Sequence, residues 1–536
     1  MTAGVRSAVR SILNLERQRR LLGRRPLFLL WLAGGILLIL GWQWAIFTAG
    51  YAREADSPFL VTASSGIQDE ARFVYFYRFL GLIPVATERP AAQLDYSRDG
   101  ALNELAEHGS SLRTEVMHTS RYGDLGKVWL FLPDVLLRGF RPQLSVKPAN
   151  AIAFVLALIC VYASACAAGQ PVFGLALVLL IGSSPFQVGE VYARDNVFGW
   201  PIITLLIAAA INLPLILGTG PRGWKWAAPL MTAFLMGTVR QIRSEPALVC
   251  GAVGFVYLWL PKQTWRVRIG LAALLAAAFV AASAGWSAYF TSKFKQADQV
   301  VARSGGAVFK GPRSIYHMVW HPIWCGLSDF GAERGYRWDD RAAARYALPI
   351  LKDRYGIEGV ELRGNEWVSA AFWDREHHYY VTPYELPHYN DVLREKVADD
   401  VRSHPAWFAG ILAKRVWRIL TETSPARLAM GRHWMPVPIY GLMLLPVIAV
   451  LIWAGSAGPL LVLALSASTS MTAFLVYSGR NTTMYSAYHL VMGALMAAWV
   501  IEAVLYWRDR RAGDAALSVS ATDTRRSTTA GATQSG

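Results

Sequence analysis

The feature that most constrains this chain is a series of long, uninterrupted runs of apolar residues. A helix needs about 20 apolar residues to cross a bilayer core of about 30 Å, whereas the half-buried elements of a soluble domain mix apolar with polar residues. Only 17% of the residues are charged, against about 25% in soluble domains. We therefore expect an all-α polytopic membrane protein with ten transmembrane helices. The runs cover residues 27–48, 149–168, 172–185, 197–217, 226–239, 246–261, 269–290, 436–454, 458–477 and 485–507.

The distribution of basic residues predicts which loops lie in the cytoplasm. Cytoplasmic loops carry an excess of Lys and Arg. Seven arginines precede the first run with Glu16 as their only acidic neighbour, so we expect the N-terminus to be cytoplasmic. These arginines are Arg6, Arg10, Arg17, Arg19, Arg20, Arg24 and Arg25.

Ten spans then leave loops 218–225 and 262–268 and the tail from 508 on the cytoplasmic side, and all three are basic. The formal net charge of +16 is therefore a topology signal. Nucleic acid is not expected as a partner, because no basic stripe with interleaved aromatic residues is present.

This topology divides the chain into seven segments. Two of them, 49–147 and 291–435, are long and face the opposite compartment. The four cysteines exclude a disulfide framework, since Cys160, Cys166 and Cys250 lie in apolar runs. The segments are a basic cytoplasmic N-terminus 1–26, the first helix 27–48, the first outer loop 49–147 with interface helices, helices two to seven in 148–290, a second outer domain 291–435, the last three helices in 436–507, and a disordered tail 508–536.

Charges near the outer ends of the spans are the main candidates for chemistry, because a charge there is costly without a partner or a role. Asp69 and Glu70 precede the aromatic run 73–79 and could hold a catalytic base at the membrane surface. Their alternative role is to favour a helix N-terminus. Arg194 and Asp195 lie in a short outer loop, as a structural pair or as part of a site.

Arginines on the outer side are the second signal, because the positive-inside rule disfavours them there. Arg240 and Arg243 occupy a tight turn with Glu245, which can pair with one of them, while a phosphate would suit the other. Arg480 precedes the last span. We expect these arginines to form an anion site for a lipid phosphate.

The histidines do not make a persuasive metal site. His317 and His321 have the i, i+4 spacing of zinc ligands on a helix, and His377 is followed by His378. No Glu follows His317, and Pro322 interrupts the helix. We therefore assign no metal ligands, and a divalent cation stays open.

Two further segments have amphipathic patterns. Residues 404–424 place Phe408, Ile411 and Ile419 on one helical stripe with Lys414, Arg415 and Arg418 around the opposite face, as in a helix lying on the membrane. Residues 128–140 could form a second interface helix. The aromatic and charged segment 320–340 suits either a carbohydrate or the lipid surface.

This layout resembles the GT-C class of integral-membrane glycosyltransferases, which use polyprenyl-phosphate-linked sugars. The resemblance rests on the cytoplasmic N-terminus, the long first outer loop with Asp69 and Glu70, Asp195 in the short second outer loop, the R-x-x-R-x-E-P turn from Arg240, and Arg480. It covers most of the chain as architecture.

The resemblance implies transfer of a sugar from a polyprenyl-phosphate donor to a glycan, lipid or protein acceptor at the outer face. Asp69 or Glu70, with Asp56 as the alternative, would be the base, and Asp195 would orient the substrates. Arg194, Arg240, Arg243, Glu245 and Arg480 would make up the lipid-phosphate site. Some relatives use a divalent cation. The expected location is the bacterial inner membrane, with the active site outside the cytoplasm.

Two other classes remain open. A polymerase or ligase for lipid-linked polysaccharides would share the outer arginines but would not need the carboxylates. A transporter would favour polar or broken helices near the middle of the membrane, whereas these runs carry their charges at their ends.

Overall fold

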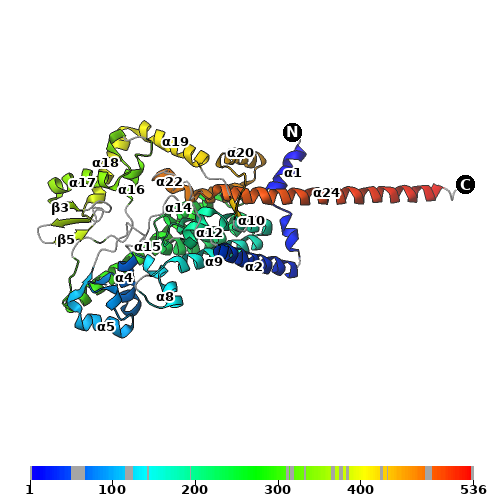
Figure 1. The fold of residues 1–536 in the computed structure, drawn as a ribbon. Coiled ribbons are helices and arrows are strands. Elements are labelled where there is room, and N and C mark those ends of the chain that lie inside the picture. Colours follow the sequence, from blue (N-terminus) through cyan, green and yellow to red (C-terminus); the bar gives the residue numbers. More distant parts are fainter. Residues whose placement is uncertain are drawn as a thin grey trace.

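The computed structural model describes residues 3–23, 25–49, 67–114, 125–141, 144–193, 195–309, 313, 319–330, 333–363, 369–373, 378–381, 386–422, 427–430, 433–476 and 486–532. The chain is mostly helical, and its apolar helices form a bundle in the centre of Figure 1. Each of the ten apolar runs contains a helix. These helices are α2 (Arg25–Ala49), α9 (Lys147–Ala167), α10 (Pro171–Gly182), α12 (Trp200–Ile216), α13 (Trp224–Val239), α14 (Pro246–Leu258), α15 (Trp265–Arg303), α20 (Leu444–Ala454), α21 (Ala457–Ser466) followed by α22 (Met471–Leu475), and α24 (Tyr488–Ala532).

The fold-class prediction is confirmed as a helical membrane protein, but the number of spans is not. Among the described residues, five helical stretches are long and apolar enough to cross a membrane: α2, α9, α15, 457–475 and the first part of α24. A sixth is the pair α10 and 185–193, which is bent by 60°. Helices of 13 to 17 residues, such as α14 and α12, are about 20–25 Å long and shorter than a bilayer core.

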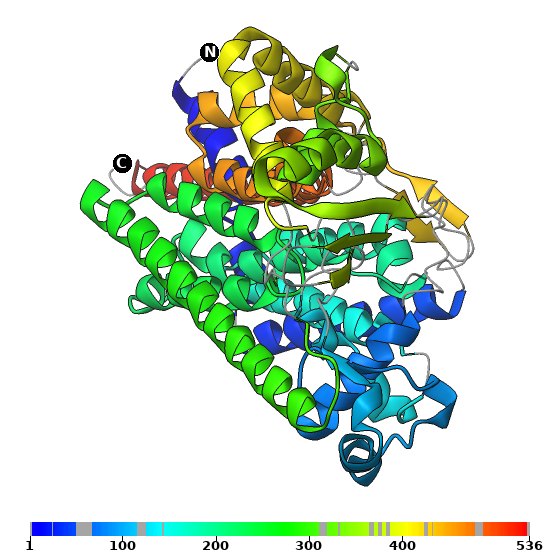
Figure 2. The ribbon, with the colours of Figure 1, turned by 90° about the vertical axis from the view of Figure 1, so that its left-hand side faces the viewer.

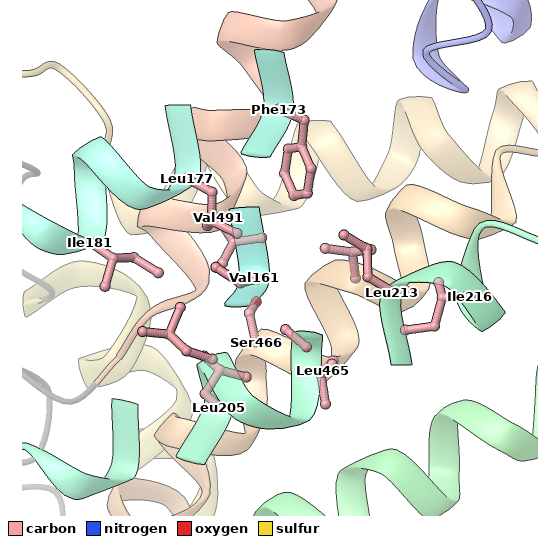
Figure 3. A pocket seen from close by; sticks show the side chains of 13 residues that line it. Val161, Phe173, Leu177, Ile181, Leu205, Leu213, Ile216, Leu465, Ser466 and Val491 are labelled. Carbon is pink, nitrogen blue, oxygen red and sulfur yellow. The ribbon is translucent and has the colours of Figure 1, made fainter. Parts of the chain in front are cut away.

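The bundle is held together by apolar packing. Side chains of α9, α10, α12, α21 and α24 meet around a small pocket of about 20 Å³ (Figure 3). Its lining is apolar apart from Ser466, whose hydroxyl donates to Leu463 O at 2.6 Å. A cavity without further polar groups offers no chemistry, so this pocket is a packing gap in the core.

Residues 67–141, which the predicted topology places outside the cytoplasm and which we call the first outer segment, fold against the far end of α15. This helix has 39 residues and is about 58 Å long, so it projects well beyond a bilayer core of about 30 Å. Its Ala297 and Val301 pack with Tyr75 and Phe76 in one apolar cluster. The elements are α4 (Ile67–Leu80), β1 (Val85–Thr87), α5 (Arg98–Glu107), β2 (Leu112–Thr114), α7 (Lys127–Leu130) and α8 (Leu132–Arg138), with β1 and β2 antiparallel.

Residues 319–435, which the predicted topology also places outside the cytoplasm and which we call the second outer segment, have an apolar core of their own. It includes Trp324, Tyr336, Leu351 and Tyr389. Its three-stranded sheet is antiparallel in the order β3-β4-β5. Both outer segments lie at the left of Figure 1 and face the viewer in Figure 2. The elements are α16 (Trp320–Gly326), α17 (Asp340–Tyr355), β3 (Glu358–Arg363), β4 (Ser369–Trp373), β5 (His378–Val381), α18 (Tyr389–Ser403), α19 (Pro405–Glu422), and the hairpin β6 (Arg427–Met430) and β7 (His433–Pro436).

The two termini lie at the opposite end of the bundle, at the right of Figure 1. Helix α1 (Ala3–Leu13) and the following turn pack against α24. The backbone N–H of Arg17 donates to the buried carboxylate of Glu502 at 2.6 Å, and Arg20 pairs with Asp509. The basic N-terminus is therefore anchored to the last helix.

Two segments differ from the sequence predictions. Helix α19 forms as expected, but Arg415 is fully buried beside Ile411 and Ile419 and does not lie on the polar face. The i, i+4 spacing of Ile411, Arg415 and Ile419 puts Arg415 on the apolar stripe, so its assignment to the opposite face was wrong. The buried carboxylate of Asp329 and two carbonyl groups stabilise its charge there. Residues 508–532, predicted to be a disordered tail, continue α24 as helix. This stretch has no proline and contains several alanines and arginines, which favour helix.

Candidate functional site

A cavity of about 480 Å³ lies where the first membrane helix meets the first outer segment and the loop after α10. Phe47, near the end of α2, forms one side. The remaining walls come from 138–151 and from the 192–195 loop. The lining residues are Phe47, Arg138, Arg141, Leu144, Ser145, Lys147, Pro148, Ala151, Tyr192 and Asp195.

Asp195 is fixed in this cavity by the segment that leads into α9. Its Oδ1 accepts hydrogen bonds from the Ser145 hydroxyl at 2.5 Å and from the Val146 backbone N–H at 3.0 Å. Charged acceptors form stronger hydrogen bonds than neutral ones, so these two bonds hold the carboxylate firmly. Asp195 thus has the fixed orientation that a catalytic or substrate-orienting carboxylate needs.

A second carboxylate holds the same segment from the other side. Asp134 is fully buried and accepts from the Ser145 backbone N–H at 2.8 Å. It also pairs with Arg138 and, at 3.3 Å, with Arg141. Both guanidinium groups remain partly exposed, so Asp134 positions two arginines at the edge of the cavity without covering them.

The charge in the cavity is mixed but favours anions. Among the described residues, three cationic side chains line it, Arg138, Arg141 and Lys147, together with one carboxylate, Asp195. Arginine forks match the oxygens of a phosphate group. An anion bound by these three cations would also lie within the same cavity as the Asp195 carboxylate.

The loop that carries Asp195 is held by buried polar contacts. The chain bends after α10, and residues 189–193 form one turn of π-helix, a feature often found at functional sites. Tyr192 donates from its hydroxyl to Gln43 Oε1 on α2 at 2.8 Å. Asn196 donates to buried Glu190 at 2.8 Å and its carbonyl accepts from Asn150 of α9. The loop is therefore tied to both neighbouring helices.

The predicted anion turn is only partly brought to this cavity. Arg243 pairs in a bidentate manner with Glu245 and lies over the ring of Phe198 at 4.8 Å, three residues beyond Asp195. Arg240 instead donates to Ser283 on α15 at 3.3 Å. Neither arginine is among the residues that line the cavity.

Several predicted site residues cannot be placed by their side chains. Asp69 and Glu70 belong to the first turn of α4, but their side chains lie outside the described residues, as do Asp56, Arg194 and Arg480. Farther along α4, Tyr75 packs edge-on against Phe140, the neighbour of Arg141, at 5.9 Å. Asp69 is six residues, or about 9 Å of helix, before Tyr75.

The sequence did not single out Arg138, Arg141 or Lys147. They belong to the weakly apolar stretch 128–140 and the residues just after it, which suggested only an interface helix. They lie about 50 residues from Asp195 and are joined to it through Ser145, a contact with no local sequence signal. A usable signal was the presence of three basic residues within ten positions on the side where the positive-inside rule disfavours them.

A second basic cavity, of about 590 Å³, lies at the opposite ends of α10 and α12. Its walls come from the N-terminal segment and from the connections near 170, 217–225, 261–263 and 455–459. Five basic residues and one acidic residue, Glu16, line it. All of these connections are ones that the ten-span topology assigns to the cytoplasmic side.

The histidines take an arrangement that their own spacing did not indicate. His317 and His377 lie outside the described residues. His321 lies beside Cys325, four residues along α16, and Asp340 at the start of α17. The His321-x-x-x-Cys325 spacing is present in the sequence, but pairs of histidines alone do not reveal it.

Comparison with known proteins does not assign the chain to a family. No protein-family model, no curated protein and no solved structure matches it. The functional argument therefore depends on the cavity beside Asp195 and on the placement of the charged residues around it.

Proposed function

We propose that the chain is an integral-membrane glycosyltransferase that moves a sugar from a polyprenyl-phosphate donor to an acceptor hydroxyl outside the cytoplasm. The observation that carries the proposal is the cavity in which Asp195 shares the lining with Arg138, Arg141 and Lys147. It combines a fixed carboxylate with an anion site next to a membrane helix. The resemblance to the GT-C class concerns the architecture, and that class carries out the same type of glycosyl transfer.

The reaction assigns one role to each kind of group. The acceptor hydroxyl gives its proton to a carboxylate as its oxygen forms a bond to the anomeric carbon of the sugar. The bond from that carbon to the phosphate oxygen breaks, and the electron pair leaves with the polyprenyl phosphate. No covalent enzyme intermediate is required, because phosphate is a good leaving group.

The three cations act on the leaving group. The donor is a phosphodiester with about one negative charge, and the departing phosphate monoester approaches two. Cations fixed beside this phosphate therefore stabilise the transition state more than the bound donor, which is the condition for faster turnover. Asp134 supports this role because it fixes Arg138 and Arg141 before the donor binds.

Asp195 is the carboxylate that the geometry favours as the base. The sequence alone favoured Asp69 or Glu70, because a long loop can reach over a lipid head group. Asp195, however, lines the cavity with the cations, and both of its hydrogen bonds from 145–146 end on Oδ1. We assign to Oδ2 of Asp195 the role of accepting the proton of the acceptor hydroxyl. We assign to Asp69 or Glu70 the role of guiding the acceptor into the cavity.

Access from the membrane supports a lipid donor. Phe47 contributes an apolar wall near the outer end of α2 and packs edge-on against Tyr192 at 5.8 Å. A prenyl chain could lie along α2, whose apolar side chains are largely exposed, while its phosphate reaches the arginines. A soluble nucleotide-sugar would gain nothing from this apolar wall.

Binding of a prenyl phosphate tests the proposal directly. Replacing Arg141 with Gln should weaken binding of decaprenyl phosphate in detergent about 10- to 100-fold, because a charge-assisted hydrogen bond contributes about 1.5–3 kcal/mol. The protein should stay folded, because the buried Asp134 carboxylate still pairs with Arg138 and still accepts from the Ser145 N–H. Calorimetric titration gives the dissociation constants.

Arg113→Gln is the matched control. Arg113 is 38% exposed and pairs with Glu88 at 3.4 Å, whereas Arg141 is 40% exposed and pairs with Asp134 at 3.3 Å. Decaprenol, which lacks the phosphate, should not distinguish the variants. Equal affinity of wild type and Arg141→Gln for decaprenyl phosphate would mean that the lipid phosphate does not bind in this cavity.

The proposed topology has ten spans, with both termini cytoplasmic and the two outer segments on the other side. Arg337→Cys and Thr264→Cys test it, because both positions are exposed and lie in segments assigned to opposite sides. In intact cells, a membrane-impermeant maleimide should label Arg337→Cys and should reach Thr264→Cys only after permeabilisation. The reverse pattern would place the cavity in the cytoplasm and exclude the proposed reaction there.

A further inference from the structure

We propose that His321, Cys325 and Asp340 form a zinc site in the second outer segment. The three residues meet where α16 contacts the start of α17, and their donor atoms lie within 4.8 Å of one another. The site is separate from the cavity beside Asp195 and does not depend on the proposed glycosyl transfer.

The separations of the donor atoms match those around one zinc ion. His321 Nε2 lies 3.0 Å from Asp340 Oδ1, and Cys325 Sγ lies 3.8 Å from the nitrogen and 3.9 Å from the oxygen. A triangle with these sides has a point about 2.1 Å from all three corners, and zinc takes nitrogen, oxygen and sulfur at about 2.0–2.3 Å. A single ion therefore reaches all three with little movement.

The ligand types select the metal. A thiolate, an imidazole and a carboxylate together suit zinc, whereas calcium and magnesium prefer oxygen donors. Three protein ligands leave a fourth tetrahedral position. The Cys325 side is buried, while the Asp340 side chain is 42% exposed, so the open position faces solvent and would take a water molecule.

A second layer of contacts orients the histidine. The other ring nitrogen, Nδ1, lies 2.9 Å from the hydroxyl of Tyr389, which is fully buried. With zinc on Nε2, the Nδ1–H donates to this hydroxyl. Such a partner fixes the ring and is typical of histidine ligands to metals.

The same residue types could suggest a cysteine nucleophile with a histidine base, but the geometry excludes it. A catalytic relay places the thiol at one ring nitrogen and the carboxylate at the other. Here Cys325 and Asp340 both face Nε2, and Tyr389 occupies Nδ1. The Cys325, Asp340 and His321 donor atoms therefore converge on one point, as metal ligands do, and do not form a catalytic relay.

The site would fasten α16 to α17 beside Arg415 of α19, the helix that packs against α22. Gly326, directly after Cys325, accepts from Arg415 Nη2 at 2.7 Å, and Arg415 Nη1 donates to Phe474 O of α22 at 3.1 Å. Zinc held by Cys325 and Asp340 would therefore fix α16 on α17. The Gly326 carbonyl of α16 would then be held in place to accept from Arg415, which also contacts α22.

Metal analysis of the full chain purified in detergent is the test. We expect about one zinc per chain, falling to less than about a tenth in Cys325→Ser and in Asp340→Asn. His388→Asn is the control, because His388 also lies near a carboxylate, Asp391 at 3.5 Å, in the same segment. It should keep its zinc.

Two further measurements cover variants that do not fold. Wild-type protein loaded with Co²⁺ should show a thiolate-to-cobalt charge-transfer band, which requires no substitution. Tyr389→Phe should keep the site but weaken zinc affinity about 10- to 100-fold in a chelator competition, since only the outer partner is lost. Wild-type protein that retains neither zinc nor cobalt would overturn the proposal, as would unchanged zinc in Cys325→Ser.

Discussion

Asp195→Asn is expected to lower the turnover of glycosyl transfer by about 10²–10⁴-fold and to leave binding of the lipid donor nearly unchanged. Asn keeps Oδ1 as an acceptor for Ser145 and Val146, so the segment leading into α9 stays in place. The substitution removes only the charge and the basicity. Initial rates with a decaprenyl-phosphate-linked sugar, measured over a range of acceptor concentrations, give kcat and KM separately.

Variants of three carboxylates, Asp195, Asp69 and Glu70, distinguish the possible bases. Asp69→Asn and Glu70→Gln should raise the KM for the acceptor more than they lower kcat, if α4 guides the acceptor. Asp391→Asn, in the first turn of α18 with a side chain that is 43% exposed, should retain wild-type rates. If Asp195→Asn kept the wild-type kcat while Asp69→Asn or Glu70→Gln lowered kcat strongly, the base would be Asp69 or Glu70. Full activity in Asp195→Asn, Asp69→Asn and Glu70→Gln would favour a polymerase or ligase that works without carboxylates.

Asp329→Ala is expected to lower the free energy of unfolding by about 3–5 kcal/mol, because it leaves the Arg415 charge buried without its partner. The Arg415 side chain is fully buried and Asp329 is 5% exposed, with 3.4 Å between Arg415 Nε and Asp329 Oδ2. Burial lowers the pKa of the Arg415 guanidinium, while Asp329 opposes this shift. Denaturant titration of the purified protein in detergent measures the change.

The paired replacement Asp329→Leu with Arg415→Met is the informative comparison. Removing both charges should restore most of the lost stability, since apolar residues of similar size often replace a buried ion pair without loss. Arg354→Met is the control, because its partner Glu395 is also exposed and such pairs contribute little. A loss in Asp329→Ala as small as in Arg354→Met would mean that water reaches Arg415.

The sequence predicted the positions of the apolar helices well because their signal is local, but among the described residues only five of these helical stretches, or six with the bent pair, are long enough to span a membrane. Each apolar run contains a helix, and 27–48 agrees with α2 within two residues at either end. The limits of α15 were less predictable, since its last turns are polar on one side and gain their burial from Tyr75 and Phe76. The bend after α10 also depends on tertiary contacts, such as Tyr192 with Gln43.

The candidate site could be predicted only in part. Asp195 was recognisable because a carboxylate in a short loop between apolar helices is unusual. Arg138 and Arg141 were not, because Asp134 and Ser145 bring them to Asp195 through contacts between distant segments.

Arg415 shows the opposite error. It was predicted to lie on the polar face of α19, but it lies on the apolar stripe, where a buried carboxylate and backbone carbonyls compensate its charge. Patterning along one helix detects polarity, whereas a partner on another element decides whether a polar group is buried.

Photo-crosslinking with a diazirine-bearing polyprenyl phosphate tests the central claim most directly, because the described residues form a basic cavity at either end of α12. We expect the label on peptides that contain Phe47 or residues 138–151, with competition by unlabelled decaprenyl phosphate and a strong reduction in Arg141→Gln. Labelling confined to residues 10–19, 217–225 or 261–263 would place the lipid phosphate in the other cavity. That result would contradict the assignment of the reaction to Asp195.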